Sequence, residues 1–220
     1  MELLPKVYKS LCEQTSNDFE WLIVDDGSID NTKVIVHRWI NEKILDIRYI
    51  YQTNGGKMRA HNEAVRNSNS ELFLCLDSDD YLIKNVVEVI IRLWKNNDSG
   101  QIAGIVALKG LNQYISLGNC ELPNISQSTL SKLYRLGFKG DTTLVFKTEI
   151  LKKYPFPEIQ GEKFITEKYI YDQIDQKYEL IVLNSICTIC EYLEDGYSKN
   201  YLKLIQDNPK GWSLYYNQCV

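Results

Sequence analysis

Apolar residues recur along the first half of the chain in two alternating patterns. Stretches of helix length with one apolar face are separated by short, nearly continuous apolar runs, which are typical of strands covered on both faces. Helices are predicted for residues 3–14, 30–43, 56–68 and 84–97. Strands are predicted for residues 19–26, 46–52, 71–77 and 101–110. This alternation predicts an α/β fold whose sheet is mostly parallel, with helices on both faces.

The second half of the chain has a less regular pattern. Residues 111–127 are polar and predict a connection that contains little helix. Beyond it the pattern predicts a strand and a short helix in 141–154, a loop and a helix in 155–174, apolar segments at 179–183 and 186–193, and a helical tail at 198–217 broken at Pro209. A length of 220 residues suits one domain, and we read the change near residue 110 as two halves of it.

Charge and hydropathy exclude some classes of function. The net charge is −4 and the sequence pI about 5.3, so non-specific nucleic-acid binding is not expected. No apolar run reaches the roughly 20 residues that a membrane-spanning helix needs. The start, "MELLPKVYKSLCEQT", is amphipathic and charged throughout, which does not fit a secretory signal.

The six cysteines are scattered, and several lie in apolar runs. We interpret them as reduced, mostly buried thiols of a cytoplasmic protein. Cys187 and Cys190 have the spacing of a redox motif or half of a zinc site. They lie in a segment that reads as extended chain, where a spacing of three puts side chains on opposite faces. No second Cys or His pair completes a zinc site, so a structural role is expected.

Two predicted strands end in clusters of acidic residues. Asp25 and Asp26 follow one strand, and Asp77, Asp79 and Asp80 follow another. The carboxyl ends of parallel strands meet at one edge of a sheet, where ligands bind. Carboxylate oxygens suit hard divalent cations, and Mg²⁺ commonly combines one or two of them with substrate phosphates. The pattern therefore predicts a Mg²⁺ or Mn²⁺ site for a nucleotide-diphosphate substrate.

Two other interpretations of the acids are open. A calcium loop that starts at Asp77 would end at Glu88, but Leu82 then stands where the loop requires glycine. Asp25 and Asp26 are also common turn residues, and Asp30 is expected to cap the following helix.

Three blocks resemble family 2 glycosyltransferases of the GT-A fold. They are "SLCEQTSNDFEWLIVDDGSIDNT", "NGGKMRAHNEAV" and "ELFLCLDSDDYL". The resemblance is strong over residues 3–110. It extends more loosely over 140–200, where the chain is similar to bacterial polysaccharide-assembly members. It implies a nucleotide-sugar-binding half at 1–110, an acceptor-binding half at 111–197 and a helical tail at 198–220.

The resemblance also implies roles for the matching positions. Asp26 would contact the nucleotide base with Asp25 nearby, and Lys57 and Arg59 would border the nucleotide or its diphosphate. The Asp-Ser-Asp (DxD) motif from Asp77 to Asp79 would bind the ribose and the metal ion. Asp80 is a further candidate metal ligand.

An inverting transfer needs a general base that takes the proton of the acceptor hydroxyl. The family places this carboxylate in the second half, often in a Glu-Asp pair at the start of a helix. Here Glu167 matches, with Lys168 in place of the second acid. Its alternative is a solvated glutamate in a first helical turn, and Glu162 and Asp141 are competing candidates. His37 and His61 are unsuited to a catalytic pair, because His37 lies in a predicted helix far from either acidic cluster and His61 is expected to pack on the sheet.

The chain departs from the family at its start. Family members usually open with a strand of the type "SIIIPVYN", whereas Met1 here falls in the following helix. Loss of a central strand would expose the edges of its neighbours. We therefore expect either a fragment, a start codon assigned too late, or a chain that folds as it stands with an impaired nucleotide site.

Together these features predict an inverting glycosyltransferase. It would move a sugar from a nucleotide-diphosphate sugar, with UDP the expected nucleotide, to a hydroxyl of a saccharide or lipid-linked acceptor in cell-surface polysaccharide synthesis. We expect it in the cytoplasm, at the inner face of the membrane. The alternatives are a nucleotidyltransferase, which would need a Gly-rich phosphate loop that is not visible, and a truncated, non-catalytic binding homologue.

Overall fold

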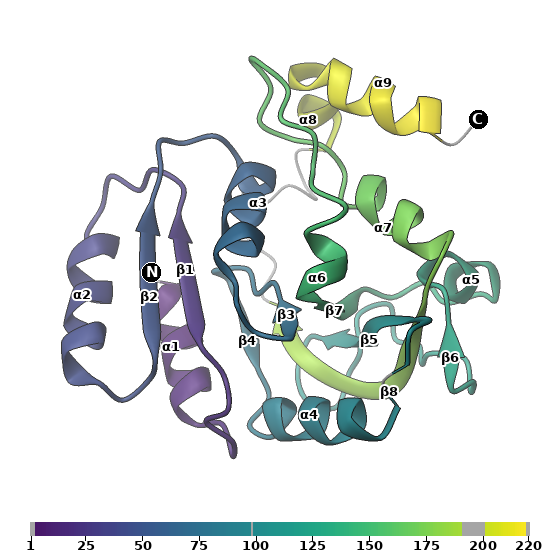
Figure 1. Cartoon of the computed structure of the whole chain (residues 1–220), viewed down its shortest axis with the longest axis horizontal. Coiled ribbons are helices and arrows are strands. Elements are labelled where there is room, and N and C mark those ends of the chain that lie inside the picture. Colours follow the sequence, from purple (N-terminus) through teal and green to yellow (C-terminus); the bar gives the residue numbers. More distant parts are fainter. Residues whose placement is uncertain (1–2, 98, 191–200, 219–220) are drawn as a thin grey trace.

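Two β-sheets organise the chain in the computed structural model, which describes residues 3–97, 99–190 and 201–218 (Figure 1). The smaller sheet pairs β1 (Trp21–Asp25) with β2 (Ile47–Tyr51) in parallel. The larger sheet has the order β3 (Leu72–Leu74), β7 (Thr142–Lys147), β5 (Ile102–Gly110), β8 (Glu179–Cys190) and β4 (Asp80–Leu82), with β6 (Gln127–Ser128) also paired to β8.

The helices that lie around both sheets are those expected from the pattern, with bounds that differ by up to a few residues, and one at 130–135 that was not expected. They are α1 (Leu4–Cys12), α2 (Thr32–Glu42), α3 (Lys57–Asn67), α4 (Val86–Asn97), α5 (Leu130–Arg135), α6 (Thr148–Leu151), α7 (Lys168–Asp175), α8 (Tyr201–Asp207) and α9 (Pro209–Gln218). The predicted break at Pro209 is confirmed, because this residue begins α9. Pro is tolerated there since the first turn of a helix needs no N–H from it.

The α/β class is confirmed, but the larger sheet is not mostly parallel. Of its strands, β5 and β8 pair in parallel, whereas β3–β7, β5–β7, β4–β8 and β6–β8 are antiparallel. A continuous apolar run indicates burial on both faces of a strand and carries no information about its direction. The predicted positions of the buried strands were therefore largely right, whereas their predicted parallel direction in the larger sheet was wrong.

Three segments differ from the prediction. The strand expected at 71–77 ends at Leu74, and the acidic segment after it leads into β4, which was not predicted. The two apolar segments after residue 178 form one long strand, β8, because bulges in its pairing with β5 carry it through the polar residues between them. β6 and α5 were not predicted. Residues 191–193 and 198–200 of the predicted segments lie outside the described residues.

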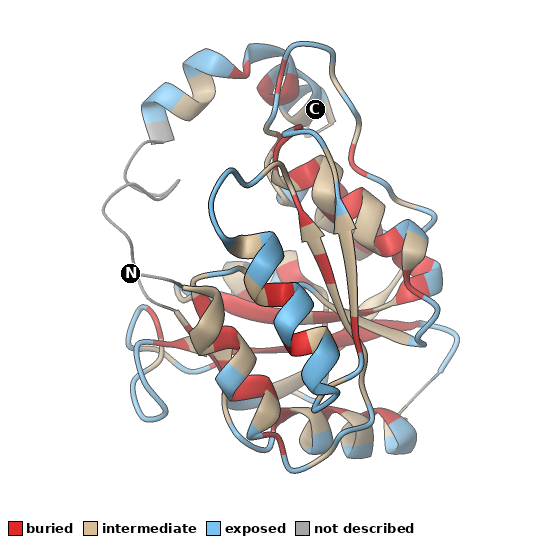
Figure 2. Ribbon diagram, turned by 90° about the vertical axis from the view of Figure 1, so that its left-hand side faces the viewer, coloured by how far each residue is buried: buried red, intermediate tan, exposed pale blue. Residues whose placement is uncertain are grey.

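β5 forms the centre of the core and joins the two halves of the chain. Its side chains alternate between the two faces of the sheet. Ala103, Val106 and Leu108 pack in a cluster with α3, α5 and α7, and Ile105 packs with α1 and α4 on the opposite face. Buried residues accordingly run along the central strands and along the inner sides of the helices (Figure 2). Since β5 pairs with β7 and β8, residues before and after position 110 share one sheet.

A cavity of about 330 Å³ separates the two sheets where β1 and β3 face each other. Within the described residues β1 pairs with β2 and β3 with β7, so the facing edges of β1 and β3 form no ladder. The cavity is lined by both strands, by the start of α1 and by α3. The facing edges are unpaired within the described residues, but the residues of β1 and β3 are half-buried or buried and not exposed as expected.

His61 lines this cavity from α3 and packs edge-on against Phe73 and Phe156. Its Nδ1 has no hydrogen-bond partner among the described residues. Burial lowers the pKa of His61 to about 4, so the imidazole is neutral near pH 7. His37 is stacked edge-on against Tyr49 on the smaller sheet. Neither environment suits a catalytic pair.

Candidate active site

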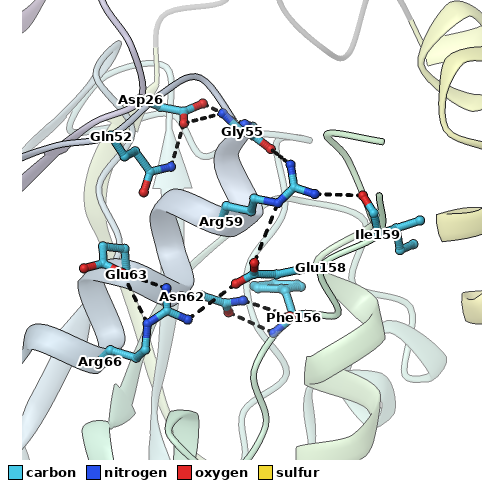
Figure 3. A network of polar contacts seen from close by, with 11 residues as sticks. Asp26, Gln52, Gly55, Arg59, Asn62, Glu63, Arg66, Phe156, Glu158 and Ile159 are labelled. Carbon is cyan, nitrogen blue, oxygen red and sulfur yellow. Dashed lines mark hydrogen bonds and ion pairs between the residues drawn. The ribbon is translucent and has the colours of Figure 1, made fainter. Parts of the chain in front are cut away.

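Asp26 organises the loop that leads into α3. Its Oδ1 accepts hydrogen bonds from Gln52 Nε2 at 2.6 Å and from the Gly55 backbone N–H at 2.8 Å, and its Oδ2 accepts from the Gly56 N–H at 2.7 Å (Figure 3). This carboxylate therefore joins the end of β1 to residues 52–56. The contacts explain why Asp follows the strand: both oxygens are needed to hold the loop.

Gly56 must be glycine in this loop. Its φ is +92°, which side-chain-bearing residues rarely adopt, and a Cβ would lie 1.9 Å from the Lys163 carbonyl oxygen. The tight approach directs the chain into α3, whose first residue is Lys57. The loop geometry thus positions Lys57 at the edge of the larger sheet.

Replacing Asp26 by Ala should loosen this loop. The change leaves the Gly55 and Gly56 N–H groups without their acceptor, and we expect the free energy of unfolding to fall by about 1–3 kcal/mol. Amide exchange at residues 54–57 should accelerate. Asp30→Ala is the matched control, since within the described residues Asp30 accepts hydrogen bonds only from Thr32, the first residue of α2, and it should leave exchange at 54–57 unchanged. Unchanged exchange in Asp26→Ala itself would show that Asp26 does not hold the loop.

Asp25 is buried and occupied by internal partners. Its Oδ1 accepts from the Ser28 N–H at 2.7 Å and its Oδ2 from the Tyr49 hydroxyl at 2.6 Å. Burial and this neighbouring carboxylate raise the pKa of Tyr49 above its ordinary value, so Tyr49 remains a donor. The contact of Asp25 with Ser28 is that of a local turn, whereas Asp26 holds the separate loop at residues 52–56.

Lys57, Asp77 and Glu167 meet at the edge beyond β3. Lys57 Nζ lies 2.7 Å from Asp77 Oδ1 and 2.9 Å from Glu167 Oε1. Asp77 comes from the segment after β3, and Glu167 immediately precedes α7. Burial alone would raise the pKa of Asp77, but the Lys57 charge outweighs it and lowers the pKa below its ordinary value. A carboxylate pair from distant parts of the chain is thus held together by one lysine.

Asp79 and Asp80 have different surroundings although they are neighbours. Asp80 is 2% exposed and forms an ion pair with Lys109 Nζ at 2.8 Å. Asp79 has no ion pair within the described ranges, and burial, together with the charges of Asp80 and Asp77, raises its pKa. Asp80 therefore compensates the charge of Lys109. Asp79 is the acid whose oxygens are available for a ligand.

The contacts of Arg59 are with the 155–161 loop. Its guanidinium donates to the Gly55 carbonyl at 3.0 Å and to the Ile159 carbonyl at 2.7 Å, and its Nε lies 3.8 Å from Glu158 (Figure 3). Asn62 fastens the same loop through two hydrogen bonds with the Phe156 backbone. These contacts favour a bracing role for Arg59.

Of the two competing base candidates, Glu162 has both carboxylate oxygens engaged within the protein. It is buried and accepts hydrogen bonds from the Lys210 and Gly211 N–H groups at the start of α9. Asp141 accepts from the Thr142 N–H and precedes β7. Glu162 anchors the C-terminal helix, which leaves Glu167 as the glutamate that meets the acidic cluster.

The cysteines of the described segments are free thiols, as predicted, but most are not buried. Cys187 is buried in β8, and Cys190, at its end, is intermediate, as are Cys12 and Cys120. Cys75 is exposed, because β3 ends before it. Cys219 lies outside the described residues.

The acids fit a metal ion only if a substrate completes its coordination. Across 3–97, 99–190 and 201–218, no three His, Cys, Asp or Glu side chains form a group that could hold a metal. Asp77 and Asp79 offer two carboxylates, the number that Mg²⁺ commonly takes from protein when phosphates supply further ligands. The calcium-loop alternative is wrong, because β4 stands where the loop would continue.

Sequence reasoning missed two residues of this site. Lys109 was read as part of a strand, yet it supplies the charge that keeps Asp80 buried. Asn62 was not singled out, yet it ties α3 to the loop before α7. The one sequence signal for Lys109 is its position as a lysine at the end of an otherwise apolar strand.

Known proteins resemble this chain in sequence and in fold. A glucosyltransferase of Escherichia coli, described as a UDP-Glc:alpha-D-GlcNAc-diphosphoundecaprenol beta-1,3-glucosyltransferase, is 26% identical over 196 residues, which cover 88% of this chain and 74% of that protein. The S. aureus TarS structure in complex with UDP-GlcNAc has a TM-score of 0.68 at 22% identity, over 88% of this chain and 56% of that one. A Pyrobaculum calidifontis mannosyltransferase in complex with GDP-Man and Mn²⁺ has a TM-score of 0.62 at 17% identity, over 98% and 65%.

These likenesses establish the GT-A fold. Other curated relatives are longer, and the chain spans about half of their length or less. The family model described as "Glycosyl transferase family 2" matches residues 2–154, which include the loop of Asp26, the Lys57 helix and the Asp77 segment. The chain belongs to glycosyl transferase family 2.

Proposed function

We propose that the chain is an inverting glycosyltransferase that moves a sugar from a UDP-sugar to a hydroxyl of a saccharide or lipid-linked acceptor. The observation that carries the proposal is the meeting of Glu167 with Asp77 through Lys57, beside the unpaired Asp79. A family 2 fold supplies the class of reaction. The family match favours this function over a nucleotidyltransferase.

Asp77 and Asp79 are the proposed metal ligands, and Asp77 also borders the ribose. A bound Mg²⁺ or Mn²⁺ would neutralise the negative charge of the leaving diphosphate. Asp80 is excluded from this set because its buried carboxylate already pairs with Lys109. Asp79 is thus proposed to contact the ligand, whereas the buried Asp80 contacts Lys109.

Glu167 is the proposed general base. Its side chain is 44% exposed, so an acceptor hydroxyl can approach it within hydrogen-bond distance. The contact with Lys57 Nζ at 2.9 Å fixes the position of this carboxylate. The proton passes from the acceptor hydroxyl to Glu167 as the oxygen attacks the sugar carbon and the bond to the diphosphate breaks.

The nucleotide is proposed to lie over the 53–57 loop. Asp26 holds this loop through the Gly55 and Gly56 N–H groups, and Arg59 donates to the Gly55 carbonyl. Residues 1–110 then bind the donor, while residues 111–197 carry the base and border the acceptor. The tail packs on this second half, since Glu162 caps α9 and Asn208 accepts from the Lys163 N–H.

The acceptor and the location are proposed from the relatives. The E. coli relative's description names a GlcNAc-diphosphoundecaprenol acceptor, and a lipid-linked sugar of this kind would be met at the cytoplasmic face of a membrane. No helix among the described residues is long and apolar enough to cross a membrane.

The test is donor turnover. UDP-Glc and UDP-GlcNAc are incubated with a GlcNAc-diphosphoryl lipid acceptor, with Mn²⁺ or with EDTA, and released UDP and the extended acceptor are quantified. We expect metal-dependent UDP release that rises with acceptor for one donor. Absence of turnover with either donor by a folded sample would favour the non-catalytic alternative.

A further inference from the structure

Lys57 forms ion pairs with two acids, Asp77 and Glu167, that have different roles in the proposed function. Its Nζ lies 2.7 and 2.9 Å from the two carboxylate oxygens of Asp77, the proposed metal ligand. It also lies 2.9 Å from Glu167, the proposed base. The three side chains come from α3, from the segment after β3 and from the start of α7. One lysine therefore connects the metal side of the site to the proton-transfer side.

Both oxygens of Asp77 face this lysine, so a metal ion that approaches Asp77 meets a cation already in contact. Two carboxylates contact this ammonium group at 2.7 and 2.9 Å and compensate for its partial burial. The lysine is consequently charged at neutral pH. Like charges at such distances repel strongly in a partly buried site, so a divalent ion can bind Asp77 fully only if Lys57 moves away.

The neighbouring pair of Lys109 and Asp80 is arranged differently. Asp80 is 2% exposed and Lys109 18%, so this ion pair is closed to solvent and to ligands. Around Lys57 the acids are 34% and 44% exposed. The two lysines at this edge thus differ in their partners. The partner of Lys109 is buried, whereas a ligand can reach both partners of Lys57.

We propose that Lys57 is a resident cation that competes with the divalent ion for Asp77 and gives way when the donor diphosphate arrives. The diphosphate offers the ammonium group new anionic partners, and Glu167 keeps the lysine at the edge meanwhile. Lys57 is then a positioning residue that makes metal binding depend on nucleotide binding. The proposal rests on the proposed function for the identity of the diphosphate.

The test measures Mn²⁺ alone, without nucleotide, by calorimetry or by the electron paramagnetic resonance of free Mn²⁺. Lys57→Gln removes the competing charge and keeps an amide that can donate to Asp77. We expect its affinity for Mn²⁺ to exceed that of the unchanged protein by about 5- to 150-fold. Lys57→Arg keeps the charge and should stay weak. Lys163→Met, which removes one positive charge beside the 53–57 loop without touching an acid, should also stay weak.

Equal or weaker Mn²⁺ binding by Lys57→Gln would overturn the proposal, as would an equal gain in Lys163→Met. If Lys57→Gln does not fold, Lys57→Met with the same readout decides. Because no nucleotide is present, the result is separate from donor binding. If neither the unchanged protein nor the variants bind UDP, the proposed function is contradicted. The comparison of Mn²⁺ affinities remains valid in that case.

Discussion

Replacing Glu167 by Gln is expected to lower kcat for sugar transfer by about 10²- to 10⁴-fold while donor binding is retained. The amide has nearly the shape of the carboxylate and can still lie beside Lys57, but it cannot accept the proton of the acceptor hydroxyl. The measurement is extended acceptor per unit time, with UDP affinity determined in parallel. The rate should fall and the UDP affinity should stay within a few-fold.

Glu149→Gln is the matched control, because Glu149 lies exposed in α6 and has no place in the site. It should transfer sugar at the unchanged rate. A Glu167→Gln protein that retains a large part of the original rate would show that another group is the base. Loss of UDP binding in the same variant would instead assign Glu167 to the donor.

Replacing Asp80 by Ala is expected to destabilise the protein strongly. The carboxylate is 2% exposed and is the ion-pair partner of Lys109. Its removal leaves a largely buried ammonium group uncompensated, for which losses of about 3–5 kcal/mol in the free energy of unfolding are typical. Denaturant unfolding at neutral pH measures this loss.

Two further variants separate a structural role of Asp80 from metal binding. Asp79→Ala should keep the free energy of unfolding nearly unchanged, since Asp79 has no ion pair in the described segments. Asp80→Ala with Lys109→Met should recover part of the loss, because no unpaired charge remains. An Asp80→Ala protein as stable as the original, with metal-dependent nucleotide binding abolished, would instead make Asp80 a metal ligand.

The difference between Asp79 and Asp80 marks the limit of what the sequence predicts. The motif located the acids after a strand, but β3 ends at Leu74 and Asp80 begins β4, while the structure brings Asp77 together with Lys57 and Glu167. Which of the adjacent acids turns inward depends on Lys109, a residue on another strand. Sequence spacing does not reveal that contact.

The strand directions and the loop of Asp26 show the same limit. Apolar runs located β1, β2, β5 and β7 because burial leaves a direct trace in composition. The antiparallel pairing of β3 with β7 depends on a partner more than 70 residues away. The hydrogen bonds that Asp26 accepts from Gly55 and Gly56 likewise join residues 29 and 30 positions apart. Both outcomes rest on long-range contacts.

The most direct test of the central claim is a calorimetric titration of UDP, with GDP as control, with and without Mn²⁺. The protein and its Asp79→Ala variant are compared after both have been shown to be folded to the same extent. We predict UDP binding that requires Mn²⁺, exceeds GDP binding and is lost in Asp79→Ala. Binding of neither nucleotide, or binding that is the same without Mn²⁺ and in the variant, would contradict a metal-dependent UDP-sugar site.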